Sequence, residues 1–484
     1  MAVSRRQFLG GAATAAFAAA WPYRLVDQLS APPARRVPVE VDLTAHRTAV
    51  LPLEQHLFDG LATVTDNGTP VTVPPLHHAV VTATLEVAPT TAALQQAQHL
   101  LETTLTGLEQ SHLLDFRPSG LGLAVAWGLP YFARLPAALT DAYLPVDLVT
   151  SRDTGTATGA LLDAVRFASD PADLLLEAND VVFVLASDHL RHIATAIDAI
   201  VDGPAGGVLR VTSVRRGFVD AHHLGSTRRS LTKRMALQAG VPGAESIPDT
   251  AQLFLGFTST QTAALGPSTI ANLEALPGVT DQWPDGYFRH GTAMHLSHIS
   301  EDLESWYQVN YRQRATFSIA PSIRPRRGTQ TIPQGPGQSE PLARVRADFA
   351  KYKFVGHSSS MQPVSRLADA VIDNYGNALP AGTTIPQRAD FNTLDNPFSF
   401  SADPTTDRMA AGPAAGVHFI AFLPTSGSFH RLRQAMDGQY GTDGDLGFEA
   451  VHGPFNNFLR TTHRQNFLVP PRAHRSFPLA ELLT

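Results

Sequence analysis

Apolar residues follow two different periods along this chain, and each period predicts one kind of element. His78–Val87 and Leu121–Trp127 are short, mostly apolar runs, which are typical of buried strands. Between them, apolar residues recur every three or four positions from Thr90 onward, which predicts an amphipathic helix. This helix would bury one stripe of side chains: Leu94, Ala97, Leu101, Leu105 and Leu108.

A strand followed by a helix is predicted three more times. Val181–Leu185 predicts a strand, and Asp188 is expected to cap the helix after it, whose apolar stripe is Leu190, Ile193, Ile197 and Ile200. Gly291–Trp306 predicts a strand and the start of a helix, and Val417–Leu423 predicts a strand before a helix that opens at Ser428. We therefore expect an α+β fold with two related modules and antiparallel sheets.

The N-terminus has the form of an export signal. Met1–Trp21 contains Ser4-Arg5-Arg6-Gln7-Phe8-Leu9, a twin-arginine motif, followed by a stretch of Ala, Gly and Phe that is too short to span a bilayer. It predicts passage through the twin-arginine translocase, which moves folded proteins, to the periplasm, the cell envelope or the outside. Residues 22–75 are rich in Pro and predict an irregular N-terminal arm.

Composition narrows the chemistry. The chain of 484 residues is 43% apolar and 17% charged, with a net charge of −6, or −6 − 2 = −8 without Arg5 and Arg6. This acidity argues against nucleic acid as a partner. The absence of cysteine excludes disulfides, iron–sulfur clusters and thiol catalysis, and leaves the 19 histidines as the main ligands for a transition metal.

The motifs that carry chemistry are spread along the chain. They are, in order, Gly217-Phe218, Gly256-Phe257-Thr258-Ser259-Thr260, Gly291-Thr292, Gly356-His357-Ser358, Gln387–Phe391 and Ala415–Phe422, and Gly291 lies 291 − 256 = 35 positions after Gly256. In this order and spacing, the chain resembles the dye-decolourising (DyP-type) haem peroxidases from about His77 onward. The resemblance implies two ferredoxin-like modules in a DyP-like dimeric α+β barrel arrangement, here residues 76–260 and 261–484, with one haem b in the second.

The resemblance also implies roles for single residues. His357 would be the proximal ligand of the haem iron, and Arg388 the distal arginine that holds peroxide and stabilises charge as the O–O bond breaks. The position of the family's distal aspartate is occupied by Ser259, whose hydroxyl is too weak a base to move a proton between peroxide oxygens. An alternative alignment on Gly217-Phe218 makes Asp220 the distal acid.

The expected activity is an exported peroxidase that uses hydrogen peroxide to oxidise a small organic or metal-ion reductant, and a homo-oligomer is compatible with it. Two rival hypotheses follow from Ser259. In the first, the chain is a haem-binding protein without catalysis, and His357 still holds the iron. In the second, it is a degenerate homologue that has lost haem and keeps a structural role.

Overall fold

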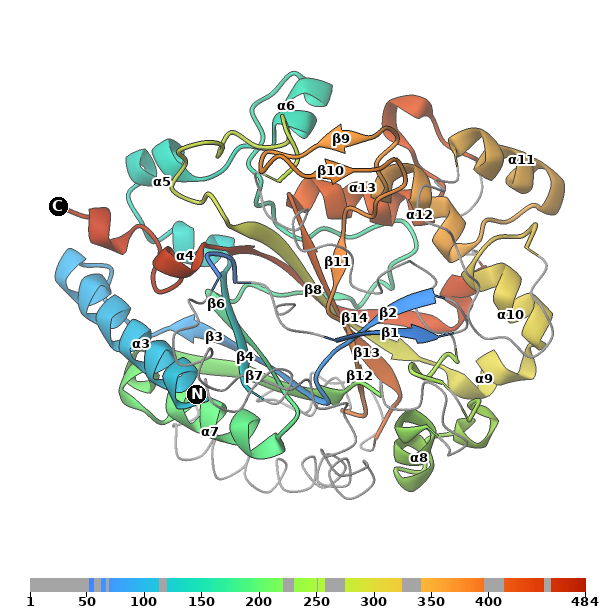
Figure 1. The fold of residues 1–484 in the computed structure, drawn as a ribbon, viewed down its shortest axis with the longest axis horizontal. Helices are drawn as coiled ribbons and strands as arrows, with labels where there is room; N and C mark the ends of the chain where they lie inside the picture. The colour runs from blue at the N-terminus through green and yellow to red at the C-terminus, as the bar shows by residue number, and fades with distance from the viewer. Residues whose placement is uncertain are drawn as a thin grey trace.

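A closed sheet forms the centre of the molecule (Figure 1). The computed structural model describes residues 52–55, 62–66, 69–112, 120–220, 230–249, 251–256, 275–323, 341–395, 413–447 and 454–484. Its largest sheet has ten strands, of which eight close into an antiparallel barrel. These eight are β3 (His77–Leu85), β4 (Gly122–Trp127), β6 (Val181–Ser187), β7 (Leu209–Phe218), β8 (Thr292–Glu301), β12 (Phe391–Thr393), β13 (Gly416–Leu423) and β14 (Leu459–Val469).

The barrel consists of two halves with the same topology. The first half contains β3, β4, β6 and β7, which lie side by side in the order β7-β3-β6-β4. The second half contains β8, β12, β13 and β14, in the order β14-β8-β13-β12. In both, the first strand lies between the fourth and the third, and the second strand is at the edge, which is the ferredoxin-like arrangement. The predicted fold class is confirmed.

Two narrow seams join the halves. β7 pairs with β12 through Phe218 and Asn392, and β4 pairs with β14 through Leu468 and Trp127. At each seam the last strand of one half meets the second strand of the other. The two halves are therefore related as the two copies of a symmetric dimer would be.

Helices cover the outside of the barrel. α3 (Thr91–His112) and α7 (Leu190–Val201) lie over the first half, and α12 (His357–Ser365) and α13 (Ser426–Met436) pack together beside β8 and β13. The predicted stripe of α3 is fully buried. Apolar side chains from both halves fill the barrel itself, among them Val80, Val182, Leu296, Ile420 and Phe467.

Three local predictions differ from the structure. α7 has His189 at its N-cap, and Asp188 instead accepts a hydrogen bond from the Leu76 backbone N–H at 3.0 Å. α13 begins at Ser426, two positions earlier than expected, because the Thr425 side chain accepts a hydrogen bond from the Ser428 N–H. Part of the predicted irregular arm is an antiparallel hairpin, made of β1 (Ala62–Asp66) and β2 (Thr69–Val73).

The remaining elements are short and lie around the barrel. The helices are α4 (Leu129–Phe132), α5 (Ala137–Tyr143), α6 (Leu148–Thr154), α8 (Leu231–Gln238), α9 (Leu303–Gln308), α10 (Tyr311–Ser318) and α11 (Leu342–Tyr352). The short strands are β5 (Leu175–Leu176), β9 (Val371–Ile372), β10 (Ala378–Leu379) and β11 (Gln387–Arg388). None of the helices within the described ranges has both the length and the apolar character needed to cross a membrane.

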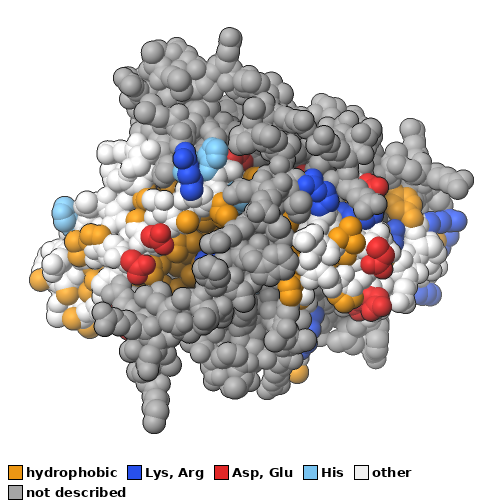
Figure 2. Space-filling model, turned by 90° about the horizontal axis from the view of Figure 1, so that it is seen from below, with side chains coloured by type: hydrophobic (Ala, Val, Ile, Leu, Met, Phe, Trp, Pro, Cys, Tyr) orange, Lys and Arg blue, Asp and Glu red, His pale blue; other side chains and the backbone are white. Residues whose placement is uncertain are grey.

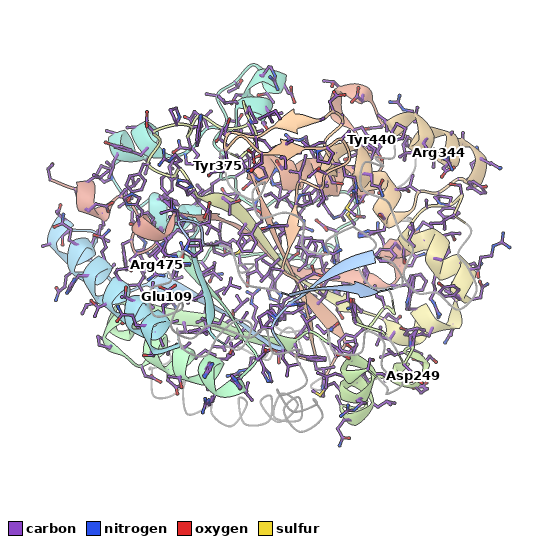
Figure 3. The ribbon with its side chains drawn as sticks, in the orientation of Figure 1. Glu109, Asp249, Arg344, Tyr375, Tyr440 and Arg475 are labelled. Atoms are coloured by element: carbon purple, nitrogen blue, oxygen red, sulfur yellow. The ribbon has the colours of Figure 1, made fainter. Side chains whose placement is uncertain are left out.

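The C-terminal segment is fastened to the first half by charge. Arg475 donates to Glu102 of α3 at 2.9 Å and lies 2.8 Å from Glu109, so that Arg475 and Glu109 appear together in Figure 3. On the surface, acidic and basic side chains are interspersed with apolar ones, as Figure 2 shows for one face. Residues 1–21, the predicted export signal, and the predicted module boundary at 260 lie outside the described residues.

Candidate functional site

The outer face of the sheet in the second half holds most of the candidate residues. Along β13, Ala421 and Leu423 pack with Phe429 and Leu432 of α13, whereas Ile420 points into the barrel. This alternation follows from the two-residue period of a strand. β13 therefore separates the barrel interior from an outer layer, and α12 and α13 cover that layer.

His357 is the first residue of α12 and is partly buried in this layer. Phe455 covers one side of its imidazole, with ring centroids 4.5 Å apart. Among the described residues, no group forms a hydrogen bond with either ring nitrogen. Burial, together with the charges of Arg388 and Arg433, lowers the pKa of His357 to about 3. The imidazole is therefore neutral at neutral pH, and its nitrogen lone pair is available to a metal ion.

The helix that carries His357 is held at both ends of its first turn. Gly356, the N-cap, lies against α10, where a Cβ would stand 2.4 Å from the Ile319 carbonyl oxygen, so only glycine fits. The Ser359 N–H donates to that same oxygen at 2.8 Å. Tyr440, labelled in Figure 3, donates from its hydroxyl to the Ser360 carbonyl at 2.9 Å. These contacts hold the first turn of α12, which begins at His357.

Arg388 lies on β11, on the same side of the sheet as Ala421, its partner on β13. Its Nε and Nη2 donate to the two carboxylate oxygens of Asp390 at 2.9 and 2.7 Å. This bidentate pair orients the guanidinium. Nη1 has no partner among the described residues, and the side chain is 27% exposed. Its charge contributes, after burial, to lowering the pKa of His357.

Glu301, the last residue of β8, is a member of this layer that the sequence did not reveal. β8 residues at odd positions share a face with His295, which pairs opposite Ala421. Burial raises the pKa of Glu301, and the charge of Asp390 raises it further, to about 8. Its Oε2 atom is buried and has no hydrogen-bond partner among the described residues. Glu301 therefore holds a proton at neutral pH.

The Gly256 motif is anchored beside Glu301 through α9. Burial raises the pKa of Tyr307, and the charge of Glu301 contributes to the same direction. The Tyr307 hydroxyl donates to the Phe254 carbonyl at 2.6 Å, and Trp306 Nε1 donates to the Leu255 carbonyl at 2.9 Å. Two side chains of α9 thus hold the chain just before the motif.

Gly256 itself has a backbone conformation that requires glycine. Its φ is +82°, and a Cβ there would lie 2.9 Å from Tyr307 Oη and 3.1 Å from the Pro248 ring. The chain then continues to Ser259, which lies outside the described residues. The motif therefore starts next to Tyr307, on the side of the molecule where Glu301 is buried.

Asp220 follows β7, whose last residue, Phe218, pairs with Asn392 of β12. It is 1% exposed and accepts a hydrogen bond from the backbone N–H of Leu231, the first residue of α8. A carboxylate at a helix N-terminus is stabilised by the unpaired N–H groups and by the helix dipole. The hydrogen bond observed for Asp220 is thus that of a helix cap.

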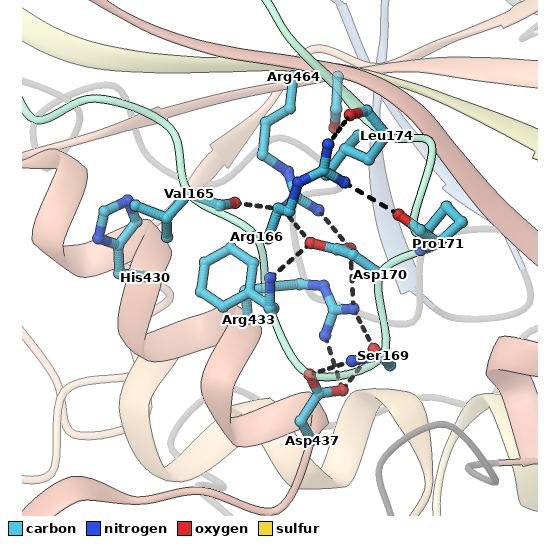
Figure 4. Close-up of polar contacts among 12 residues, drawn as sticks. Val165, Arg166, Ser169, Asp170, Pro171, Leu174, His430, Arg433, Asp437 and Arg464 are labelled. Carbon is cyan, nitrogen blue, oxygen red and sulfur yellow. Dashed lines mark hydrogen bonds and ion pairs between the residues drawn. The ribbon is translucent and has the colours of Figure 1, made fainter.

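A group of charged side chains, which we call the latch, ties the loop before β5 to the second half (Figure 4). Asp170 accepts hydrogen bonds from Arg464 Nη1 at 2.5 Å and Nη2 at 2.9 Å, and Arg433 lies 3.4 Å from it. Both guanidinium groups also stack over Phe167. The latch consists of Phe167, Ser169, Asp170, Arg433, Asp437 and Arg464. Because Arg433 also acts on the pKa of His357, the latch borders the site.

Arg388 binds Asp390, and the charges of these two residues act on the pKa of His357 and of Glu301, respectively. The residues present suit a haem, since a neutral imidazole without a hydrogen bond from the described residues can serve as an axial ligand. Within the described residues, no three His, Cys, Asp or Glu side chains are grouped as a metal site of their own. Neither Glu301 nor the latch belongs to a sequence motif. The only feature of the sequence that could have pointed to Glu301 is a glutamate at the end of a strand.

Comparisons with known proteins give one family and one group of similar structures. A model of the family of unknown function DUF7405 matches residues 75–471, and no curated protein matches the chain. The chain is similar to DyPB from Rhodococcus jostii RHA1, with 13% identity, a TM-score of 0.46, and coverage of 84% of this chain and 96% of that one. The encapsulated DyP-type peroxidase from Mycobacterium smegmatis has 12% identity, a TM-score of 0.44 and the same coverage of 84% and 96%.

Proposed function

This chain belongs to a family of unknown function, DUF7405, and we propose that it is an exported haem peroxidase that oxidises a small organic or metal-ion reductant with hydrogen peroxide. One observation carries the proposal. His357 presents a neutral imidazole, without a hydrogen bond from the described residues, and the charge of Arg388 acts on its pKa. An axial ligand and a cation for peroxide are the two protein groups that such a reaction needs first.

In this proposal His357 binds the iron of one haem b. The ring is supported by Phe455 on one side and by the backbone contacts of α12 below, which restrict its orientation. When bound, haem would supply the redox-active iron that exchanges electrons with peroxide. The low pKa of the imidazole keeps the proton from competing with the metal down to about pH 3.

Arg388 would bind the peroxide. Asp390 engages Nε and Nη2, so that the remaining Nη1 is presented in a fixed direction. A held guanidinium donates a hydrogen bond to a peroxide oxygen and stabilises the negative charge that grows on it. Asp390 is here a positioning residue, since it acts through Arg388.

The cellular part of the proposal rests on the sequence. Ser4–Leu9 carries the twin-arginine motif, which would bring the folded, haem-loaded chain to the twin-arginine translocase. We place the mature protein in the periplasm, the cell envelope or the extracellular space. Lysine in place of both Arg5 and Arg6 should keep the protein in the cytoplasm, which fractionation of the cells would measure.

The test of haem binding is an absorption spectrum of the purified full chain. We expect a Soret band that disappears in His357→Ala and persists in His99→Ala, an exposed histidine of α3. Arg388→Leu should keep the band and slow the reaction with peroxide by about a hundredfold or more, the range found when one stabilising donor is removed. A wild-type chain that incorporates no haem would contradict the proposal.

A second candidate, a haem carrier without turnover, is favoured by Ser259 at the position of the family's aspartate. The two differ in the reaction with peroxide. A peroxidase oxidises its reductant over many turnovers, whereas a carrier shows a Soret band and no sustained oxidation. The degenerate homologue, which keeps only the fold, would show neither.

A further inference from the structure

An arginine at the end of α12 is buried, and the part of the chain that the structure describes offers it no carboxylate. Arg366, the residue after α12, is 6% exposed, and its Nη1 donates to the Gly382 carbonyl at 2.7 Å. Its Nε and Nη2 atoms are buried as well, and neither has a hydrogen-bond partner among the described residues. A buried cation left in this state costs free energy, which an anionic partner would recover.

The two unpaired atoms form one edge of the guanidinium group. In Arg388 the same edge donates to both oxygens of Asp390, at 2.9 and 2.7 Å. In Arg134 it donates to both oxygens of Asp180, at 3.0 and 2.8 Å. An N–H edge cannot bind a cation, and its two parallel donors match the two oxygens of a carboxylate. The unpaired edge of Arg366 therefore fits a carboxylate that the described residues do not provide.

Backbone contacts place Arg366 between the helix of His357 and the strand of Arg388. α12 rises about 12 Å from His357 to Ser365, the residue before Arg366. Arg366 itself forms an antiparallel bridge with Thr384. Thr384 lies four positions before Arg388, and four residues of chain span at most about 14 Å. The side chain of an arginine and the edge of a porphyrin can together bridge such distances.

The same helix packs against the layer that carries Arg388. Met361 and Val364 of α12 join an apolar cluster that also includes Phe419 of β13. The guanidinium carbon of Arg388 lies 6.0 Å from the centre of the Phe419 ring. Apolar packing thus holds α12 to this layer, and the contact with Gly382 fixes the guanidinium that follows α12, so little order has to be gained when a ligand binds.

We propose that Arg366 binds a carboxylate of the haem, a propionate side chain, through Nε and Nη2. In this arrangement His357 binds the iron and Arg366 neutralises an anionic side chain of the same molecule, so that the two ends of α12 hold one ligand. The proposal rests on the proposed function for the identity of the ligand, whereas the unpaired guanidinium edge is a property of the chain itself. No covalent bond forms or breaks, and the gain is that of a charge-assisted bidentate pair.

The first measurement compares haem with its dimethyl ester, in which the propionates are neutral. The purified, haem-free full chain is titrated with each, and the change in absorbance gives the affinity. Wild type should bind haem about tenfold to a hundredfold more tightly than the ester, the range expected for hydrogen bonds to a charged group. Arg366→Gln should lose this preference by binding haem more weakly, and Arg366→Lys, which keeps the charge without the planar fork, should lose part of it. The control Arg210→Gln, at an exposed arginine of β7, should keep it.

The stability of the haem-free chain separates a binding role from a structural one. An arginine that only supports the fold would lower this stability when replaced, and would weaken the binding of haem and ester alike. We expect instead that haem-free Arg366→Gln unfolds at a urea concentration no lower than wild type, because it no longer buries an unpaired charge. A less stable haem-free variant, equal affinities of wild type for haem and ester, or a preference for haem that persists in Arg366→Gln would overturn the proposal.

Succinate, a small carboxylate, distinguishes the failure of this proposal from that of the proposed function. A wild-type chain that binds neither porphyrin would contradict the proposed function and remove haem as the ligand. Succinate should still raise the urea midpoint of the wild type and leave that of Arg366→Gln unchanged, because only the wild type has the guanidinium edge. That result would keep Arg366 as a carboxylate site, whereas an equal effect on both chains, or none, would overturn the site as well.

Discussion

The two halves of the barrel share a topology but differ in what lies under their helices. In the first half, α3 and α7 cover the sheet with aliphatic side chains such as Leu101, Leu105 and Ile193. In the second half, α12 and α13 cover a layer that includes His357, Arg433 and the outer side chains of β8. The order of strands is the same in each, so the strand order does not account for the difference.

This contrast suggests a division of roles, in which the first half contributes stability and the second half carries the candidate site. An aliphatic layer contributes stability through burial, whereas a layer of ionisable groups loses free energy through desolvation. Among the described residues, the six histidines whose pKa is lowered all lie in the second half: His295, His298, His357, His418, His430 and His463. The first half therefore supplies stability that the second half needs.

Lowering the pH should produce the largest difference in stability between the two halves. A histidine that stays neutral in the fold has a lower pKa there than the value of about 6.5 in the unfolded chain. Its contribution to stability is fully present above pH 6.5 and is lost as the pH falls toward the folded pKa. For His430 and His463 the folded pKa is about 4. Each unit of depression is about 1.4 kcal/mol, so stability should drop steeply between pH 6.5 and 4.

Hydrogen exchange can locate this loss. The opening free energies of amides in β8 and β13 should fall before those of β3 and β6 as the pH is lowered from 7 to 4, because the groups that must take up protons lie beside β8 and β13. Loss of protection in the first half before the second would contradict the comparison.

The latch tests how the halves depend on each other. Asp170→Asn removes the charge that Arg464 and Arg433 share and leaves two buried guanidinium groups without it. We expect a loss of about 3 to 5 kcal/mol in the free energy of unfolding, measured from urea midpoints at constant slope. The control Asp173→Asn breaks a surface pair with Arg460 and should cost about 1 kcal/mol or less.

A substitution in the first half should reduce stability and leave the site intact. Leu101 of α3 is 0% exposed, so Leu101→Ala leaves a cavity and should cost about 3 kcal/mol. Leu100→Ala, at a partly exposed neighbour, should cost less. In both variants the Soret band expected for the full chain should be that of the wild type. A shifted band in Leu101→Ala would mean that the first half also tunes the site.

The spacing of apolar residues along the chain was enough to predict the main helices and strands of the barrel. The stripes of α3 and α7 and the strands β3, β4, β6 and β13 follow from spacing, because burial of one face or stripe leaves a periodic pattern. The sequence predicted the starts of the helices less well. Thr425 and Asp188 both have side chains that can cap a helix, but only Thr425 does so, at the start of α13. Asp188 is instead bound to the Leu76 backbone.

The candidate site was predictable only in part. His357 and Arg388 lie within motifs that resemble a known family, and in the structure the charge of Arg388 acts on the pKa of His357. Glu301 lies in no motif and becomes visible only when the register of β8 against β13 places it on the face of Arg388. The latch joins residues that are 294 positions apart at Asp170 and Arg464, and no local pattern encodes such a contact.

The last expected effect concerns the stability contributed by Glu301. Its pKa is about 8 in the fold, above the ordinary value of 4.5, so the folded state holds one more proton than the unfolded state between these pH values. Stability must then fall as the pH rises through this range. Glu301→Gln keeps the shape and removes the ionisation, so it should be more stable than the wild type at pH 8 by about 4 kcal/mol and nearly equal to it at pH 4.5. Urea unfolding at the two pH values measures the difference. An equal gain at both would assign the effect to packing, and the protonated glutamate would no longer distinguish the second half from the first.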